Sequence, residues 1–379
     1  MSRLARAAAC WLLALAVAPS LAASPSIIVT VDVETTTDLP LTQQIDAVCT
    51  DGVPCGLTRI ASMLKARGFR GTFFLDVYEH RLVGEATLKK IALDLQAQGH
   101  DVALHTHPQW VYDASQPYMY AYGLEEQQRI IAEGKRLLEE WTGLPVVAHR
   151  AGAYSANSDT LEALRRNGIF LDSSLFLDHA DSHLNGLGLP SNLPSSVHGV
   201  TEIPVTVYER QERPAFLPSF LPPFRSVRKI DADWFVDEKE ASAALNAVVA
   251  ADLPYITLFL HSFSLISGLS PDGKPIDDVL TQRVLETMLD GIQKQHLEVV
   301  TMRELAARTD LLQQHATDIV PGVVVQAPLY RYAAHMLIEH WILAIVAGGL
   351  TLLIVAVSGV LWFVRPPVPR SSTAGGSAI

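Results

Sequence analysis

Acidic and imidazole side chains close two apolar runs of this sequence. The first run ends Thr30-Val-Asp-Val-Glu34, and the second ends Gly99-His-Asp-Val-Ala-Leu-His-Thr-His107. Charged groups at the ends of buried strands need a compensating partner, and a divalent metal ion that also polarises a substrate carbonyl is an economical one. The side chains that could supply this chemistry are Asp32, Glu34, His105 and His107. Together they predict a metal-dependent hydrolase.

The composition predicts a large globular domain without a nucleic-acid-binding surface. The chain has 379 residues, of which 49% are hydrophobic and 18% charged, so we expect a sizeable buried core. Its formal net charge is -11, and it lacks clusters of Lys and Arg with interleaved aromatic residues. Because binding to nucleic acid needs such clusters, we expect no nucleic-acid partner.

The N-terminus has the pattern of a cleavable signal peptide over residues 1–23. Arg3 and Arg6 precede the apolar run Ala7–Val17, and small residues follow it up to Ala22 and Ala23. A charged start, a short apolar core and a small-residue cleavage site predict export, with cleavage near one of these two alanines. An uncleaved N-terminal anchor is the alternative.

A second apolar segment, Trp341–Val364, predicts a transmembrane helix. It carries no charged residue and, at about 1.5 Å rise per residue, is long enough to span a bilayer. Arg365 and Arg370 follow it, which places residues 365–379 in the cytoplasm as a short tail. We therefore expect a single-pass membrane protein whose residues 24–310 lie on the extracytoplasmic side, periplasmic or extracellular, with a juxtamembrane connector over residues 311–340.

Two of the three cysteines belong to the expected exported domain. Cys49 and Cys55 are close in sequence, whereas Cys10 lies in the first apolar run. In an oxidising compartment the pair could close a small disulfide loop, or it could remain as two free buried thiols.

Residues 24–310 alternate short β-rich runs with stretches of helical period, as parallel βα units do. We expect strands at 26–31, 71–75, 101–104, 146–149, 169–171, 202–205, 255–260 and 298–300. We expect helices near 57–67, 85–98, 125–141, 158–167, 238–250, 277–295 and 302–307. About seven such units predict an α/β fold, a distorted (β/α) barrel whose active site lies at the carboxyl ends of its strands. The proline-rich segment 213–225 is expected to be a loop or a rim.

Five short motifs, in order along the chain, resemble those of the polysaccharide deacetylases, carbohydrate esterase family 4. The resemblance spans about Ile27 to Leu305. The motifs are Asp32 with Glu34, Thr72-Phe-Phe74, Gly99-His-Asp101 leading to His105 and His107, Arg150-Ala-Gly-Ala-Tyr154, and Leu260-His261-Ser262. Their order makes the match specific, although no single motif would be.

The first motif departs from the family pattern, in which two acids are adjacent. Here Val33 separates Asp32 from Glu34. Side chains at positions i and i+2 share one face of a strand, so both carboxylates can still point into one site.

The histidine motif departs as well. Four residues after His105, where the family has its second histidine, stands Gln109, a poor metal ligand. The resemblance then implies that His107 supplies the second imidazole, or that fewer protein groups hold the metal. Asp101 is a weaker candidate for the missing metal ligand.

The resemblance implies a hydrolase of carbon–nitrogen (non-peptide) bonds that removes N-acetyl, or less often O-acetyl, groups from a cell-envelope or exported polysaccharide. A divalent metal, zinc above all, is expected on Glu34, His105 and His107. The resemblance also implies four catalytic roles. Asp32 is the base and Arg150 orients it. The backbone amide near Tyr154 binds the oxyanion, and His261 is the general acid.

Each of these side chains also has a structural interpretation. Asp32 and Glu34 could cap a loop after a strand, and His105 and His107 could be ordinary loop histidines. The departure at Gln109 leaves a second function open, a non-catalytic glycan-binding or assembly component that keeps the barrel. A hydrolase of another C–N bond on the same barrel is a third, because a fold does not determine a substrate.

Overall fold

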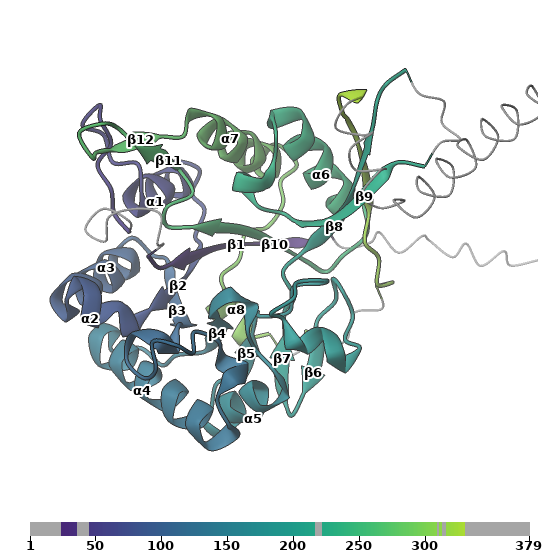
Figure 1. Ribbon diagram of the computed structural model, residues 1–379. Coiled ribbons are helices and arrows are strands. Elements are labelled where there is room, and N and C mark those ends of the chain that lie inside the picture. Colours follow the sequence, from purple (N-terminus) through teal and green to yellow (C-terminus); the bar gives the residue numbers. More distant parts are fainter. Residues whose placement is uncertain (1–23, 36–44, 217–221, 309–310, 313–315, 330–379) are drawn as a thin grey trace, which may run out of the picture. The chain divides into compact units, whose positions relative to one another are not determined.

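The computed structural model describes residues 24–35, 45–216, 222–308, 311–312 and 316–329 (Figure 1). The expected signal peptide, transmembrane segment and cytoplasmic tail lie outside these residues. Among the described residues, no helix is both long and apolar enough to cross a membrane. The chain divides into two units, residues 1–209 with 227–323 and residues 210–226 with 324–379. All the candidate site residues fall in the first unit.

One eight-stranded sheet forms the centre of the first unit, in the order β10-β1-β2-β3-β4-β5-β7-β6. Its strands are β1 Ser26–Val33, β2 Thr72–Asp76, β3 Asp101–Thr106, β4 Ala148–Ala151, β5 Leu171–Asp172, β6 Ser195–Val197, β7 Val200–Glu202 and β10 Tyr255–His261. All neighbours pair in parallel except β6 and β7, which are antiparallel. The expected α/β class is confirmed.

Helices cover the outer face of this sheet, as Figure 1 shows. They are α1 Leu57–Lys65, α2 His80–Val83, α3 Glu85–Ala97, α4 Leu124–Thr142, α5 Ser158–Arg166, α6 Glu238–Ala250 and α7 Val279–Lys294, whereas the short helix α8 Met302–Ala306 lies on the other face. Side-chain caps fix several of their starts. The Asn157 side chain accepts the Thr160 N–H at the start of α5, and the Asp278 side chain accepts the Thr281 N–H at the start of α7. Strand β1 is buried throughout, which explains its unbroken apolar run.

The last helix, α8, closes the inner side of the sheet. Its Met302 and Leu305 share a buried apolar cluster with Ile28, Phe74 and Ala103 of three central strands. The Met302 N–H also donates to the Thr72 hydroxyl at 2.8 Å. This cluster fills the curled sheet below the layer that carries the candidate site.

The sheet is a curled half-barrel with two ends, which is consistent with the distorted (β/α) barrel that we expected. Between β10 and the segment after β7, hydrogen bonds that involve side chains take the place of a continuous ladder of backbone hydrogen bonds. Thr257 donates its N–H to the Thr206 hydroxyl at 2.8 Å and its hydroxyl to the Pro204 carbonyl at 3.2 Å. Pro204 has no N–H to donate, which works against a regular strand pairing there.

A disulfide joins Cys49 to Cys55, the first of the two alternatives left open by the sequence. The loop that it closes packs beside a small hairpin, β11 Ile266–Leu269 and β12 Pro275–Asp277. The Thr50 N–H donates to the Pro275 carbonyl at 3.1 Å. The loop, together with Ile266, forms a small apolar cluster of its own.

Three further strands form a separate sheet in the order β13-β8-β9. They are β8 Val207–Arg213, β9 Phe224–Lys229 and β13 Gly322–Gln326. The proline-rich segment expected to be a loop connects β8 to β9, and its residues 217–221 lie outside the described residues. Strand β13 lies in the stretch that we expected to be a juxtamembrane connector.

Candidate functional site

The strand register places the candidate residues in one layer at the carboxyl ends of the parallel strands. Asp32 at the end of β1 pairs with His261 of β10 on one side and with Phe74 of β2 on the other. Across the next strands, His105 of β3 pairs with Arg150 of β4. In parallel sheets with crossover helices, ligands bind at this edge. The five sequence motifs therefore meet because their strands are in register.

Three possible metal ligands converge in this layer. The Glu34 carboxylate lies 3.0 Å from Nε2 of His105 and 2.6 Å from Nε2 of His107. Glu34, His105 and His107 each offer a ligand atom, and these atoms all lie within 4.8 Å of one another. Two imidazoles and one carboxylate are the donor set of many catalytic zinc sites, which leave a coordination position for water or substrate.

The second ring nitrogen of His105 is already engaged. Its Nδ1 lies 3.0 Å from the Arg150 carbonyl oxygen, an acceptor that requires a proton on Nδ1. Nε2 faces Glu34, and in the neutral ring it is the nitrogen left to bind a metal ion. Metal-binding histidines are held in this way, with one ring nitrogen donating to a carbonyl and the other binding the ion. The residues present therefore fit a divalent cation.

Gln109 lies beside His107 rather than in place of a ligand. Its side-chain amide is 3.4 Å from Nδ1 of His107, so Nε2 of that ring is directed to Glu34. On the opposite side, the ring packs against Gly152, where a Cβ atom would come within 2.3 Å of the ring. The position of His107 thus depends on the absence of a side chain at residue 152.

Asp32 is held by a buried ion pair. Its Oδ1 accepts a hydrogen bond from Nη1 of Arg150 at 2.7 Å, and Oδ2 lies 3.9 Å from Nε2 of His105. Asp32 is 3% exposed and Arg150 is fully buried. The carboxylate therefore lies beside the candidate metal ligands with one oxygen bound by the guanidinium and the other directed to the site.

Arg150 is itself fixed from all sides. Its Nε donates to the Ser173 carbonyl at 2.9 Å, and Nη2 donates to the Ser173 hydroxyl at 3.0 Å. Its Cζ lies 4.3 Å from the ring centre of Phe74 and 5.0 Å from that of Phe259. The two rings stabilise the cation and exclude water from it.

The Arg150 motif ends in a tight turn, η5 Gly152–Tyr154. Ala153 and Tyr154 have φ values of 50° and 57°, a left-handed conformation that non-glycine residues seldom adopt. Such strain persists where neighbouring contacts hold it, and it is common at functional sites. Here the Ser155 hydroxyl donates to the Gly152 carbonyl at 2.7 Å and closes the turn.

His261 lies between two carboxylates. Its Nε2 is 3.6 Å from Glu34 Oε1, and its Nδ1 is 3.9 Å from Asp233 Oδ2. Burial alone would lower the pKa of His261, but the carboxylates of Asp233 and Glu34 outweigh it and raise that pKa above its usual value. Asp233 was not predicted from the sequence, although the acid pair Asp231 and Asp233 in a short segment before α6 could have indicated it.

Electrostatic pairing keeps the carboxylate of Glu34 ionised. Burial alone would raise the pKa of Glu34, yet the two facing imidazoles lower it well below its usual value. For His105, burial acts to lower the pKa, but the charges of Asp32 and Glu34 raise it. A cation bound among these groups would replace the protons that now balance the carboxylates.

Two buried acids beside the site were also missed. Asp76 ends β2, and Glu79 lies in the following turn, η2 Val77–Glu79. Burial raises the pKa of Glu79 to about 7, and burial together with Glu79 raises the pKa of Asp76 well above its usual value. Glu79 accepts the N–H and the hydroxyl of Thr35 at 2.8 and 2.7 Å, and so anchors the chain just after Glu34.

Asp101 does not take part in the site, which corrects its place as a substitute ligand. It begins β3, at the opposite end of that strand from His105, and pairs with Nε of Arg303 at 2.9 Å. Its carboxylate thus fastens α8 to the sheet.

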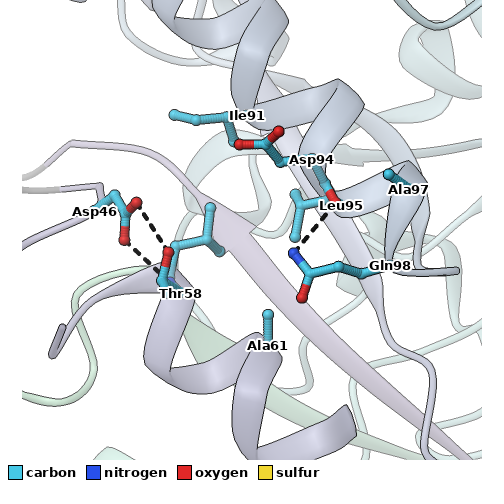
Figure 2. Close-up of a pocket in the computed structure, with 9 residues that line it drawn as sticks. Asp46, Thr58, Ala61, Ile91, Asp94, Leu95, Ala97 and Gln98 are labelled. Atoms are coloured by element: carbon cyan, nitrogen blue, oxygen red, sulfur yellow. Dashed lines mark hydrogen bonds between the residues drawn. The ribbon is translucent and has the colours of Figure 1, made fainter.

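A surface pocket of about 400 Å³ lies away from these residues, between α1 and α3 (Figure 2). Asp46 accepts hydrogen bonds from Thr58 at its rim, and Gln98 donates to the Asp94 carbonyl across from it. None of the candidate site residues lines this pocket.

We expect Gly152→Ala to weaken zinc binding about tenfold or more, because the new methyl group must displace the His107 ring and supporting contacts of ligands carry effects of this size. Competition with a chromophoric chelator measures the affinity. Gly186→Ala is the matched control, since nothing lies within 4 Å of a Cβ there. Equal zinc affinity in wild type and Gly152→Ala would show that His107 is not a ligand.

Part of the chain matches a known protein family. Residues 46–170 match the family described as polysaccharide deacetylase. This span includes His105, His107, Arg150 and Tyr154, whereas Asp32, Glu34 and His261 lie outside it. No curated protein matches the sequence.

Several solved structures are similar to this chain at low sequence identity. A candidate polysaccharide deacetylase from Mycobacterium smegmatis is 19% identical, with a TM-score of 0.49 over 81% of this chain and 95% of that chain. A carbohydrate esterase family 4 pseudoenzyme from Bacillus anthracis is 15% identical, with a TM-score of 0.41 over 76% and 69% of the two chains. Peptidoglycan deacetylase PdaC from Bacillus subtilis is 12% identical, with a TM-score of 0.38 over 75% and 91%. The family match confirms the resemblance seen in the motifs: residues 46–170 are similar to the polysaccharide deacetylases.

Proposed function

We propose that this protein is a metal-dependent deacetylase that hydrolyses N-acetyl, or less often O-acetyl, groups on a cell-envelope or exported polysaccharide. The observation that carries the proposal is the convergence of Glu34, His105 and His107 beside the Asp32–Arg150 ion pair. A set of metal ligands next to a separately held carboxylate is what hydrolysis of an unactivated amide requires.

Glu34, His105 and His107 would hold the cation, with zinc favoured by their nitrogen and carboxylate donors. When bound there, the ion supplies a Lewis acid for the acetyl carbonyl and lowers the pKa of water.

Asp32 acts as the general base. It accepts a proton from the attacking water through Oδ2, the oxygen that Arg150 leaves available. The buried guanidinium fixes the direction of this carboxylate. Arg150 therefore orients the base and makes no contact of its own with the acetyl group.

Tyr154 and His261 act on the carbonyl oxygen and on the departing nitrogen. The backbone N–H of Tyr154 donates to the oxyanion that forms from the carbonyl oxygen. Protonated His261 gives its proton to the departing nitrogen, a role for which its raised pKa suits it at neutral pH. Asp233 stabilises the imidazolium form.

The export and membrane signals of the sequence support a substrate located at the membrane, without identifying it. A signal peptide at residues 1–23 and a helix at 341–364 would hold the domain outside the cytoplasm, close to glycans that are made or exported at that membrane. Peptidoglycan, an exopolysaccharide and a lipid-linked sugar all satisfy this condition.

The two acids are expected to respond differently to substitution. Asp32→Asn should retain zinc and lose nearly all acetate release, whereas Glu34→Ala and His105→Ala should lose zinc as well. Metal analysis and an acetate assay on an N-acetylglucosamine oligomer measure both. Loss of zinc in Asp32→Asn would show that the roles of the two acids are exchanged.

The rate is expected to fall at high pH as His261 loses its proton. Since its pKa is raised, the fall should lie above about 6.5, the ordinary value for histidine. Asp233→Asn removes a neighbouring negative charge, so the fall should move to lower pH. The kcat/KM profile of both zinc-loaded proteins measures it, and an unmoved profile in the variant contradicts the role of Asp233.

The membrane anchor is tested by cell fractionation. The full chain should sediment with membranes and resist alkaline extraction, and a chain that stops before Trp341 should be released in soluble form. Alkaline extraction of the full chain would contradict a transmembrane segment.

A further inference from the structure

Lys229, the last residue of β9, is a buried cation. Its side chain is 4% exposed, and an isolated ammonium group at such a position would be very costly. Asp231 Oδ2 lies 2.9 Å from its Nζ, and the Phe259 ring centre lies 3.5 Å away. Burial alone would lower the pKa of Lys229, but Asp231 and Tyr154 raise it, so the ammonium form persists.

The third contact of this cation leads to the proposed oxyanion site. Nζ of Lys229 donates to the Tyr154 hydroxyl at 2.9 Å. The Tyr154 ring also packs against Phe176 and Phe259, with ring centres 5.1 and 5.8 Å apart. These apolar contacts are non-directional, whereas a hydrogen bond to a charged group fixes the position of the hydroxyl.

The backbone of Tyr154 needs such a restraint. Ala153 and Tyr154 are both left-handed, a strained conformation that persists only where the surroundings hold it. The Ser155 hydroxyl holds the turn from one side through Gly152. On the other side, the bonded Tyr154 side chain is the connection between the turn and β9.

We propose that Lys229 is a positioning residue: through the Tyr154 hydroxyl it holds the left-handed turn, and with it the amide N–H of residue 154, where the oxyanion forms. Asp231 serves to keep this cation buried. The catalytic part of the inference rests on the proposed deacetylase function, whereas the effect on the turn does not.

The positional claim can be tested without any substrate. The full chain in detergent, labelled with ¹⁵N only at its 10 tyrosines, gives few amide signals, and Tyr154→Phe identifies the one from residue 154. In Lys229→Met this amide should shift, and its hydrogen exchange should accelerate about tenfold to a hundredfold, the ratio expected when a hydrogen bond to a charged group is lost. Lys239→Met, at an exposed lysine of α6, should leave it unchanged.

Unchanged exchange and shift of the residue 154 amide in Lys229→Met would overturn the proposal. Should that variant fail to fold because Asp231 is left unpaired, Lys229→Met/Asp231→Asn removes both charges together and carries the same test.

Kinetics test the catalytic part. Lys229→Met and Tyr154→Phe should each lower kcat about tenfold to a hundredfold with KM nearly unchanged, since a misplaced donor acts on the transition state. The double variant should be no slower than the slower single one, because both changes remove the same contact. Multiplying losses would overturn the link through the hydroxyl. Absence of acetate release in wild type, with the amide response intact, would instead refute the proposed deacetylase function alone.

Discussion

The buried ion pair between Arg150 and Asp32 is the interaction on which the rest of the site depends. The guanidinium holds the carboxylate proposed as the base, and the carbonyl of the same residue fixes the ring of His105. Arg150 therefore positions both the proposed base and a candidate metal ligand. Removing one partner from such a pair typically costs about 3–5 kcal/mol, because the other charge stays buried and unpaired. The pair is stable here because Ser173 and two aromatic rings complete the surroundings of the cation.

A second charge balance surrounds Glu34. Three imidazoles, His105, His107 and His261, lie within 4 Å of its carboxylate. Two of them are the candidate ligands, and the third is the candidate acid, so the carboxylate couples binding of a cation to the protonation of His261. A bound cation would weaken the attraction of Glu34 for that proton and leave Asp233 as its main partner. Glu34 thus contacts both the candidate metal site and His261, whereas Asp233 contacts His261 and none of the candidate ligands.

Most of the fold could be predicted because the hydrophobic period and the length of each segment distinguish its helices from its strands. Helix α6 has the expected bounds, and most of the other helices and strands of the central sheet differ from expectation by a few residues. The sequence did not indicate where the sheet opens, between β10 and the segment after β7. That opening depends on Pro204, Thr206 and Thr257, whose contacts join segments far apart in the chain. Hydrophobic periodicity describes one segment at a time and cannot indicate a contact between distant segments.

The candidate site was predicted as far as its motifs extend. Asp32, Glu34 and His105 follow apolar runs, which marks them in the sequence. Lys229 and Asp233 were missed because they lie outside regular apolar runs and because a buried lysine looks like any other until its partners are known.

Metal content of the purified full chain, before and after exhaustive chelation, tests the central claim most directly when acetate release from an N-acetylglucosamine oligomer is followed alongside it. We expect about one zinc or similar ion per chain, and acetate release that stops with chelation and returns with the metal. A protein that binds no metal under any condition, or whose acetate release is indifferent to the chelator, would contradict it.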